Sequence, residues 1–210
     1  NNGNGTFAEI GATAGVNDTG NATGAAWADY DNDGDLDLYR ANYGGPNRFY
    51  RNHGSGNNYL QVALTGTISN ETGIGTRVTA TIGIDKQILV VDGGSGHASQ
   101  GSLPVEFGLG SATQVDALTV EWPSGYIQTL TNISANQVQQ ITENPPPTLV
   151  FNTNDSGPGS LRQAILNANA TTGVVETITF DIPGPGPHSI QPTSELADIT
   201  DPIIIDGTTQ

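Results

Sequence analysis

The stretch DYDNDGDLDL, residues 29 to 38, decides how the first part of this chain folds. Every second position carries an aspartate, and like charges packed this closely repel unless a cation or a wide solvent shell neutralises them. Gly34 permits a tight turn, and hard oxygen ligands around such a turn suit Ca²⁺, which takes about six to eight oxygens. The sequence therefore predicts a calcium site built from Asp29, Asp31, Asp33, Asp35 and Asp37, with Asp35 able to contribute its carbonyl oxygen.

The flanks of this loop favour a β-hairpin over an EF-hand. An EF-hand needs a glutamate twelve residues along and helices on both sides, whereas position 40 is Arg40 and residues 24–28 and 36–42 read as strands. The alternative is a solvated acidic loop that only keeps the protein soluble. We expect a structural ion, because metal-dependent hydrolysis needs an open site and a general base, and the sequence indicates neither.

Composition favours a mainly all-β protein with few possible partners. The chain of 210 residues is 35% hydrophobic and 13% charged, has 28 Gly and no Cys, and carries a net charge of −15. This charge disfavours binding to nucleic acid and leaves divalent cations as natural partners. No apolar run is long enough to span a membrane.

Alternating hydrophobic residues predict an antiparallel β-sandwich over residues 57–142. Leu60, Val62 and Leu64 alternate with polar neighbours, and the runs at 78–82 and 118–122 follow the same period. The segment 122–125, WPSG, joins two such runs and predicts a hairpin turn, since Pro stops a ladder and Gly allows positive φ.

Three consecutive prolines mark the clearest domain boundary. We expect domains at residues 1–56 and 57–142, a linker at 143–148, and a last segment at 149–210. In that segment, Ser160 can cap a helix over 160–168, and the apolar runs 149–151, 177–182 and 203–205 predict strands. Similar runs about one coil apart indicate a small β-helix-like segment with one capping α-helix.

Seven Asn-x-Ser/Thr sequons make N-glycosylation possible. They lie at Asn4, Asn17, Asn21, Asn70, Asn132, Asn154 and Asn169.

Three parts of the chain resemble known families. The stretch NNGNGTFAEI…GAAWADYDNDGDLDLYRANYGGPNRFYRN resembles the end of an FG-GAP/VCBS repeat, the blade unit of integrin-type β-propellers. The stretch GIGTRVTA…VVDGGSGHASQGSLPVEFGLG…VDALTVEWPSG resembles the ASPIC/UnbV domain that follows such repeats in secreted proteins. Residues 153–207, including TNDSGPGSLRQAILNANA, resemble the cap and first coil of right-handed parallel β-helices of bacterial surface proteins. The resemblance implies an extracellular calcium-binding β-module without established chemistry.

These expectations leave three functions open. The first is a non-catalytic, calcium-stabilised module, secreted or on a bacterial cell surface, that associates head to tail with copies of itself through open β edges, as a fibre subunit would. The second is an adhesin-like part of a larger surface protein that binds glycans or a partner protein. The third is a polysaccharide-active enzyme, which we do not expect, because the chain lacks a recognisable catalytic cluster.

Overall fold

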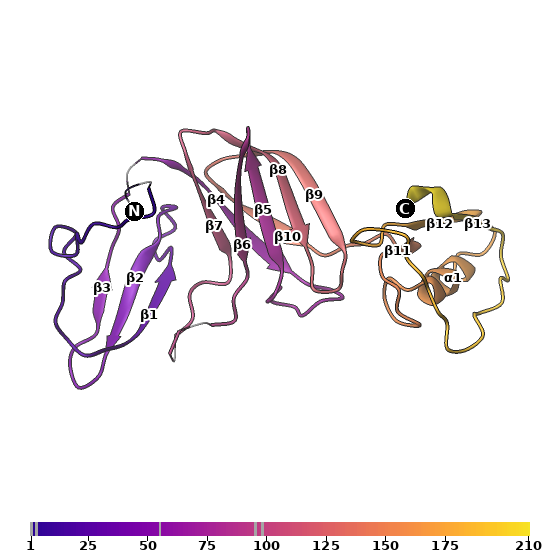
Figure 1. Cartoon of the computed structure of the whole chain (residues 1–210), viewed down its shortest axis with the longest axis horizontal. Helices are drawn as coiled ribbons and strands as arrows, with labels where there is room; N and C mark the ends of the chain where they lie inside the picture. The colour runs from indigo at the N-terminus through magenta and orange to yellow at the C-terminus, as the bar shows by residue number, and fades with distance from the viewer. Residues whose placement is uncertain (1, 3, 55, 95, 98) are drawn as a thin grey trace. The chain divides into compact units, whose positions relative to one another are not determined.

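A computed structural model describes residues 2, 4–54, 56–94, 96–97 and 99–210. The chain divides into two compact units, one of residues 1–56 with 92–102, the other of residues 57–91 with 103–210. Figure 1 shows a chain built mainly from β-strands, with a single α-helix among the described residues. The mainly-β prediction is therefore confirmed.

The first unit contains an antiparallel meander that carries the aspartate loop. Strands β1 (Ala22–Ala28), β2 (Asp37–Asn42) and β3 (Arg48–Tyr50) pair in the order β1-β2-β3. Ala28 at the end of β1 lies opposite Asp37 at the start of β2, so the loop leaves and re-enters the sheet at one point. The predicted strand, loop and strand are confirmed.

Two sheets form the sandwich of the second unit. The strands are β4 (Asn58–Thr65), β5 (Arg77–Ile82), β6 (Asp85–Val90), β7 (Val105–Gly110), β8 (Gln114–Glu121), β9 (Ile127–Ser134) and β10 (Gln137–Thr142). One sheet has the order β10-β4-β7 and the other β6-β5-β8-β9. These strands bury side chains at alternate positions in a shared core, as the period-2 pattern predicts. The fully buried residues include Leu60, Val62, Val78, Leu118 and Val120.

One pair of strands differs from the expected purely antiparallel arrangement. β10 runs parallel to β4, with Gln137 opposite Leu60. The chain crosses between sheets directly after β9, and Asn136 donates its backbone N–H to the Tyr59 carbonyl at 2.7 Å. β10 therefore enters its sheet at the end where β4 begins, and the two strands must run in the same direction.

The turn between β8 and β9 forms as predicted. The backbone N–H of Trp122 donates to Tyr126 at 2.9 Å, and that of Gly125 donates to Trp122 at 2.9 Å. Gly125 has a φ of +97°, which a residue with a side chain rarely adopts. The Trp-Pro-Ser-Gly segment is thus a hairpin turn.

Glu143, which the sequence places in the linker, is fully buried at the end of the sandwich. Its carboxylate accepts backbone N–H bonds from Thr67, Ile68 and Ser69 at 3.0, 3.0 and 2.7 Å. The hydroxyls of Ser69 and Ser124 also donate to it. Its own backbone continues the ladder, because Glu143 N–H donates to Thr65 at 2.9 Å. Glu143 is therefore part of the sandwich, and the linker at 143–148 stays a prediction.

Residues 92–102 connect β6 to β7 but pack with the first unit. Ser102 donates its backbone N–H to the Trp27 carbonyl of β1 at 2.8 Å. Glycines allow this approach, since a Cβ on Gly24 would lie 3.1 Å from the His97 carbonyl and one on Gly101 would lie 3.2 Å from that of Trp27. This segment covers part of the β1 edge, which the sequence does not predict.

The C-terminal segment combines one helix with a small parallel sheet. Strands β11 (Leu149–Val150), β12 (Glu176–Phe180) and β13 (Ile203–Asp206) pair in parallel, in that order. Helix α1 (Leu161–Asn169) begins at the predicted cap, where Ser160 Oγ accepts the Gln163 N–H, and a short 3₁₀ helix, η1 (Gly207–Thr209), follows β13. The β-helix resemblance itself stays a prediction.

Candidate metal centre

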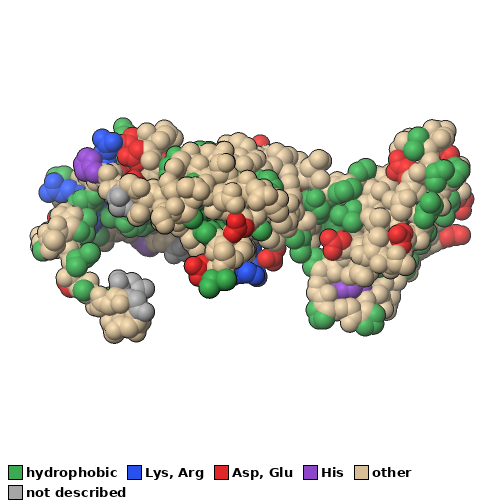
Figure 2. Space-filling model, turned by 90° about the horizontal axis from the view of Figure 1, so that it is seen from above, with side chains coloured by type: hydrophobic (Ala, Val, Ile, Leu, Met, Phe, Trp, Pro, Cys, Tyr) green, Lys and Arg blue, Asp and Glu red, His purple; other side chains and the backbone are tan. Residues whose placement is uncertain are grey.

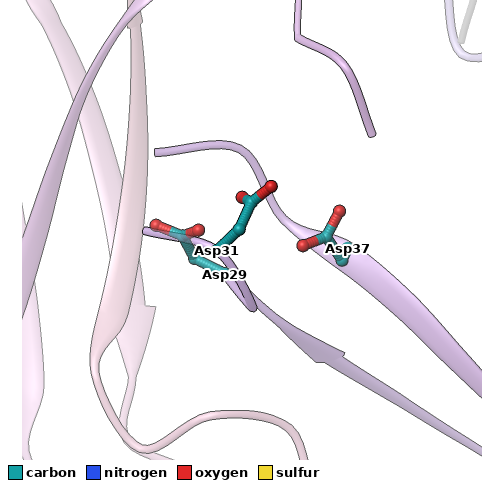
Figure 3. Close-up of side chains that lie close together, drawn as sticks. All are labelled: Asp29, Asp31 and Asp37. Carbon is teal, nitrogen blue, oxygen red and sulfur yellow. The ribbon is translucent and has the colours of Figure 1, made fainter. Parts of the chain in front are cut away.

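Three aspartates of the loop bring their carboxylates together. One oxygen each of Asp29, Asp31 and Asp37 lies within 4.8 Å of the other two. Figure 3 shows the three side chains close together; Asp29 directly follows β1, Asp31 lies in the loop and Asp37 begins β2. Asp37 is almost fully buried, and Asp29 and Asp31 are partly buried. Carboxylates this close repel one another, and a cation among them would relieve the repulsion.

Asp29 and Asp37 hold the loop in place through backbone N–H groups. Asp29 accepts from the N–H groups of Asp33 at 3.1 Å and Gly34 at 3.0 Å. Asp37 accepts from Tyr30 at 3.0 Å and from Asn52, just after β3, at 2.7 Å. Each carboxylate oxygen keeps a second lone pair, so these bonds organise the loop without excluding an ion.

Asp31 is the member of the group without such support. Both of its oxygens are buried and accept no directed hydrogen bond from the described part of the chain. The negative charge of Asp31 is compensated by an ion pair with the Arg51 guanidinium, which lies close to Oδ2 but not in hydrogen-bond geometry with it. A buried carboxylate oxygen normally has a hydrogen-bond or metal partner.

Asp33 and Asp35 lie outside the group of three. The Asp33 carboxylate accepts the Asp35 N–H at 3.1 Å and lies 3.6 Å from Arg51. Asp35 packs its carboxylate on Gly54, where a Cβ would lie 2.0 Å from Oδ2. The structure thus brings three of the five predicted ligands together.

Residues 51–54 form a second part of the site that the sequence analysis missed. Arg51, the Asn52 N–H and Gly54 each contact a different aspartate of the loop. The sequence signal that could have indicated residues 51–54 is a basic residue and a glycine shortly after β3. That signal is weak, since it acquires meaning only once β3 is known to lie beside β2.

The residues present fit a calcium ion. The three converging carboxylates offer only oxygen ligands, the type that Ca²⁺ prefers. Asp31 supplies the specific observation, because its buried Oδ1 accepts no hydrogen bond from the described residues and its Oδ2 has only the Arg51 ion pair, so an ion among the three carboxylates would be a partner for it.

An apolar cavity of ≈ 430 Å³ adjoins this site on the first unit. Its lining includes Ala26 and Ala28 of β1, Tyr39 of β2 and the buried Asp37. Tyr30 and Phe49 line it as well and contact each other edge to face, with ring centroids 5.1 Å apart. Asp37 therefore has apolar side chains on the side that lines this cavity.

The predicted sequons occupy different environments. The asparagines at 4, 17, 21, 70, 132 and 154 are exposed, whereas Asn169 is partly buried. The side-chain amide of Asn70 donates to the Ile74 carbonyl at 2.7 Å, and that of Asn169 to the Asp198 carbonyl at 2.7 Å. The amide nitrogens of these two residues are engaged within the fold, so the other five are the more accessible acceptors.

Comparisons with known families match the first two of the three resemblances. Residues 1–40 match the family model described as FG-GAP-like repeat, and residues 66–147 match the one described as ASPIC and UnbV. No curated protein matches the chain. FG-GAP repeats are typical of extracellular or surface proteins. Within the described residues, no helix is both long and apolar enough to cross a membrane.

Proposed function

We propose that this chain, an FG-GAP-like repeat followed by an ASPIC/UnbV domain, is a non-catalytic, calcium-stabilised module of an extracellular surface protein that associates with copies of itself. The observation that supports the calcium site is the buried Asp31 carboxylate, which accepts no hydrogen bond from the described residues and lies among three converging carboxylates. An ion held there would join the end of β1, the loop and the start of β2.

A structural role for the ion agrees with the way the carboxylates are used. Asp29 and Asp37 accept four backbone N–H bonds in total, two each, so both side chains help to fix the conformation of the loop. Ligands that also organise the backbone favour binding coupled to folding rather than a site with open positions for a substrate.

Calcium is expected to raise the stability of the first unit. An ion that binds only the folded state stabilises it by about 2.7 kcal/mol when its concentration is a hundred times the dissociation constant. Thermal unfolding followed by circular dichroism, with calcium or with EGTA, measures this. Identical melting curves in both, together with no heat of binding in calorimetry, would contradict the calcium site.

Open sheet edges support self-association. In the described structure β13 pairs only with β12 and leaves its other edge open, and β3 likewise ends its sheet. Ile204 and Ile205 of β13 are 53% and 50% exposed, and Figure 2 shows green hydrophobic side chains on the surface at the right end, where this segment lies. An unpaired, apolar edge is a template for another strand, and a head-to-tail contact of this kind extends into filaments.

Assembly is expected to depend on concentration and on the β13 edge. Sedimentation velocity and electron microscopy of the full chain should show oligomers or fibres that diminish when Ile204→Lys places a charge on the edge strand. Ile84→Lys is the matched control, because Ile84 is 98% exposed outside that sheet. A monomer at all concentrations would exclude self-association and leave the calcium site untouched.

A further inference from the structure

Arg51 is placed as a cation inside the aspartate loop. It directly follows β3, and its guanidinium pairs with Asp31 and lies 3.6 Å from Asp33. Since Asp31 accepts no directed hydrogen bond from the described residues, Arg51 is its main electrostatic compensation. An arginine and a calcium ion at this carboxylate weaken each other's binding to it, because two positive charges a few ångströms apart repel.

We propose that Arg51 is an internal counter-ion that occupies Asp31 at low calcium and competes with the ion for it. This inference rests on the proposed calcium site. Calcium binding is then an exchange: the guanidinium leaves Asp31 for solvent as the ion takes its place. Arg51 thereby lowers the affinity for calcium and keeps the loop folded when the ion is scarce.

The local structure allows this exchange without moving the backbone. The Arg51 side chain is 50% exposed, so its guanidinium can turn into water. The next residue stays anchored, since Asn52 donates its N–H to Asp37 at 2.7 Å and accepts the Gly54 N–H at 3.0 Å. Only a side chain needs to move, which costs little beyond the ion pair itself.

Two neighbouring arginines provide a matched pair of variants. Arg51→Gln removes the charge at the loop, whereas Arg48→Gln removes one from the same strand region. Arg48 has a similar exposure of 56% but pairs with Asp18, at 3.4 Å, instead of with the loop. Both variants change the net charge equally, so long-range electrostatic effects are matched and screened by salt.

Calorimetric titration of the full chain with calcium chloride tests the exchange. We expect Arg51→Gln to bind calcium about tenfold more tightly than the wild type, because the competing charge is gone, and Arg48→Gln to change the affinity by less than about threefold. In EGTA, Arg51→Gln should melt below the wild type, since Asp31 has lost its partner. In saturating calcium the two should melt together.

The outcomes separate this inference from the proposed function. If wild type and Arg51→Gln bind calcium equally, the counter-ion role is overturned and the calcium site stands. If neither protein binds calcium, the site itself fails and the exchange with it. If Arg48→Gln tightens binding as much as Arg51→Gln does, the effect is one of net charge, which also overturns the specific role of Arg51.

Discussion

Replacing Glu143 with alanine is expected to lower the free energy of unfolding of the sandwich by about 3–5 kcal/mol, the range seen when one partner of a buried charged network is removed. The carboxylate is fully buried and accepts three consecutive backbone N–H groups and two hydroxyls. Alanine would leave these donors without their acceptor, and each one that stays buried and unsatisfied costs about 1–3 kcal/mol before relaxation. Urea unfolding followed by tryptophan fluorescence measures the loss.

A surface glutamate supplies the control for this change. Glu121 pairs with Arg77 at 3.3 Å on the sandwich, and the two side chains are 35% and 52% exposed. Glu121→Ala is expected to cost less than about 1 kcal/mol, as exposed ion pairs do. The loss of unfolding free energy for Glu143→Gln should fall between these two values, because the Gln amide keeps one acceptor oxygen but places an N–H donor next to the other donors. Equal costs for Glu143→Ala and Glu121→Ala would show that the buried network contributes little.

The same residue makes the sandwich sensitive to acid. Burial raises the pKa of Glu143, but the hydrogen bonds from Ser124 and from the N–H groups of residues 67–69 outweigh it, so the pKa lies below its ordinary value of 4.5. A carboxyl with a lowered folded-state pKa stabilises the protein above its unfolded pKa. That stability is lost as the pH falls below about 4.5 and through the folded value. We expect the difference in stability between wild type and Glu143→Ala to shrink over that window.

Replacing Asp37 with asparagine is expected to weaken calcium binding about a hundredfold, equivalent to about 2.7 kcal/mol. Asp37 is 2% exposed and belongs to the group of three carboxylates. Asparagine removes the charge and presents an N–H₂ group to the N–H of Tyr30 or Asn52, so it disturbs the loop as well. Calcium titration by calorimetry measures the affinity, and circular dichroism checks that the chain folds.

Asp35→Asn is the matched control, because it removes the same charge from the same loop outside that group. We expect it to weaken binding less than about fivefold through loss of net charge alone. A variant of Asp35 that loses as much affinity as Asp37→Asn would show that all five aspartates act together, as the sequence pattern predicts. The comparison therefore decides between five ligands and three.

The hairpin, the sandwich and the helix could be predicted because each is encoded by neighbouring residues. Alternation of apolar and polar residues specifies which face of a strand is buried, and it marks β4, β5 and β8 correctly. Ser160 marks the start of α1 because capping involves residues only three apart. The turn at 122–125 depends likewise on a few adjacent side chains.

Long-range pairing could not be predicted in the same way. Glu143 looks like a linker residue beside three prolines, yet the backbone N–H groups that donate to its carboxylate lie more than seventy residues earlier in the chain, at 67–69. The parallel pairing of β10 with β4 and the packing of residues 99–102 on β1 have the same origin. None of these contacts leaves a periodic signal in the sequence.

By itself, the sequence determined that the chain is mainly β, that an aspartate-rich loop joins two strands, and which two families its parts resemble. Only the tertiary structure decided which carboxylates converge, that Arg51 sits among them, and that Glu143 is buried. The physical reason is range: propensity and periodicity act between near neighbours, whereas charge compensation depends on which distant segments the fold brings within a few ångströms.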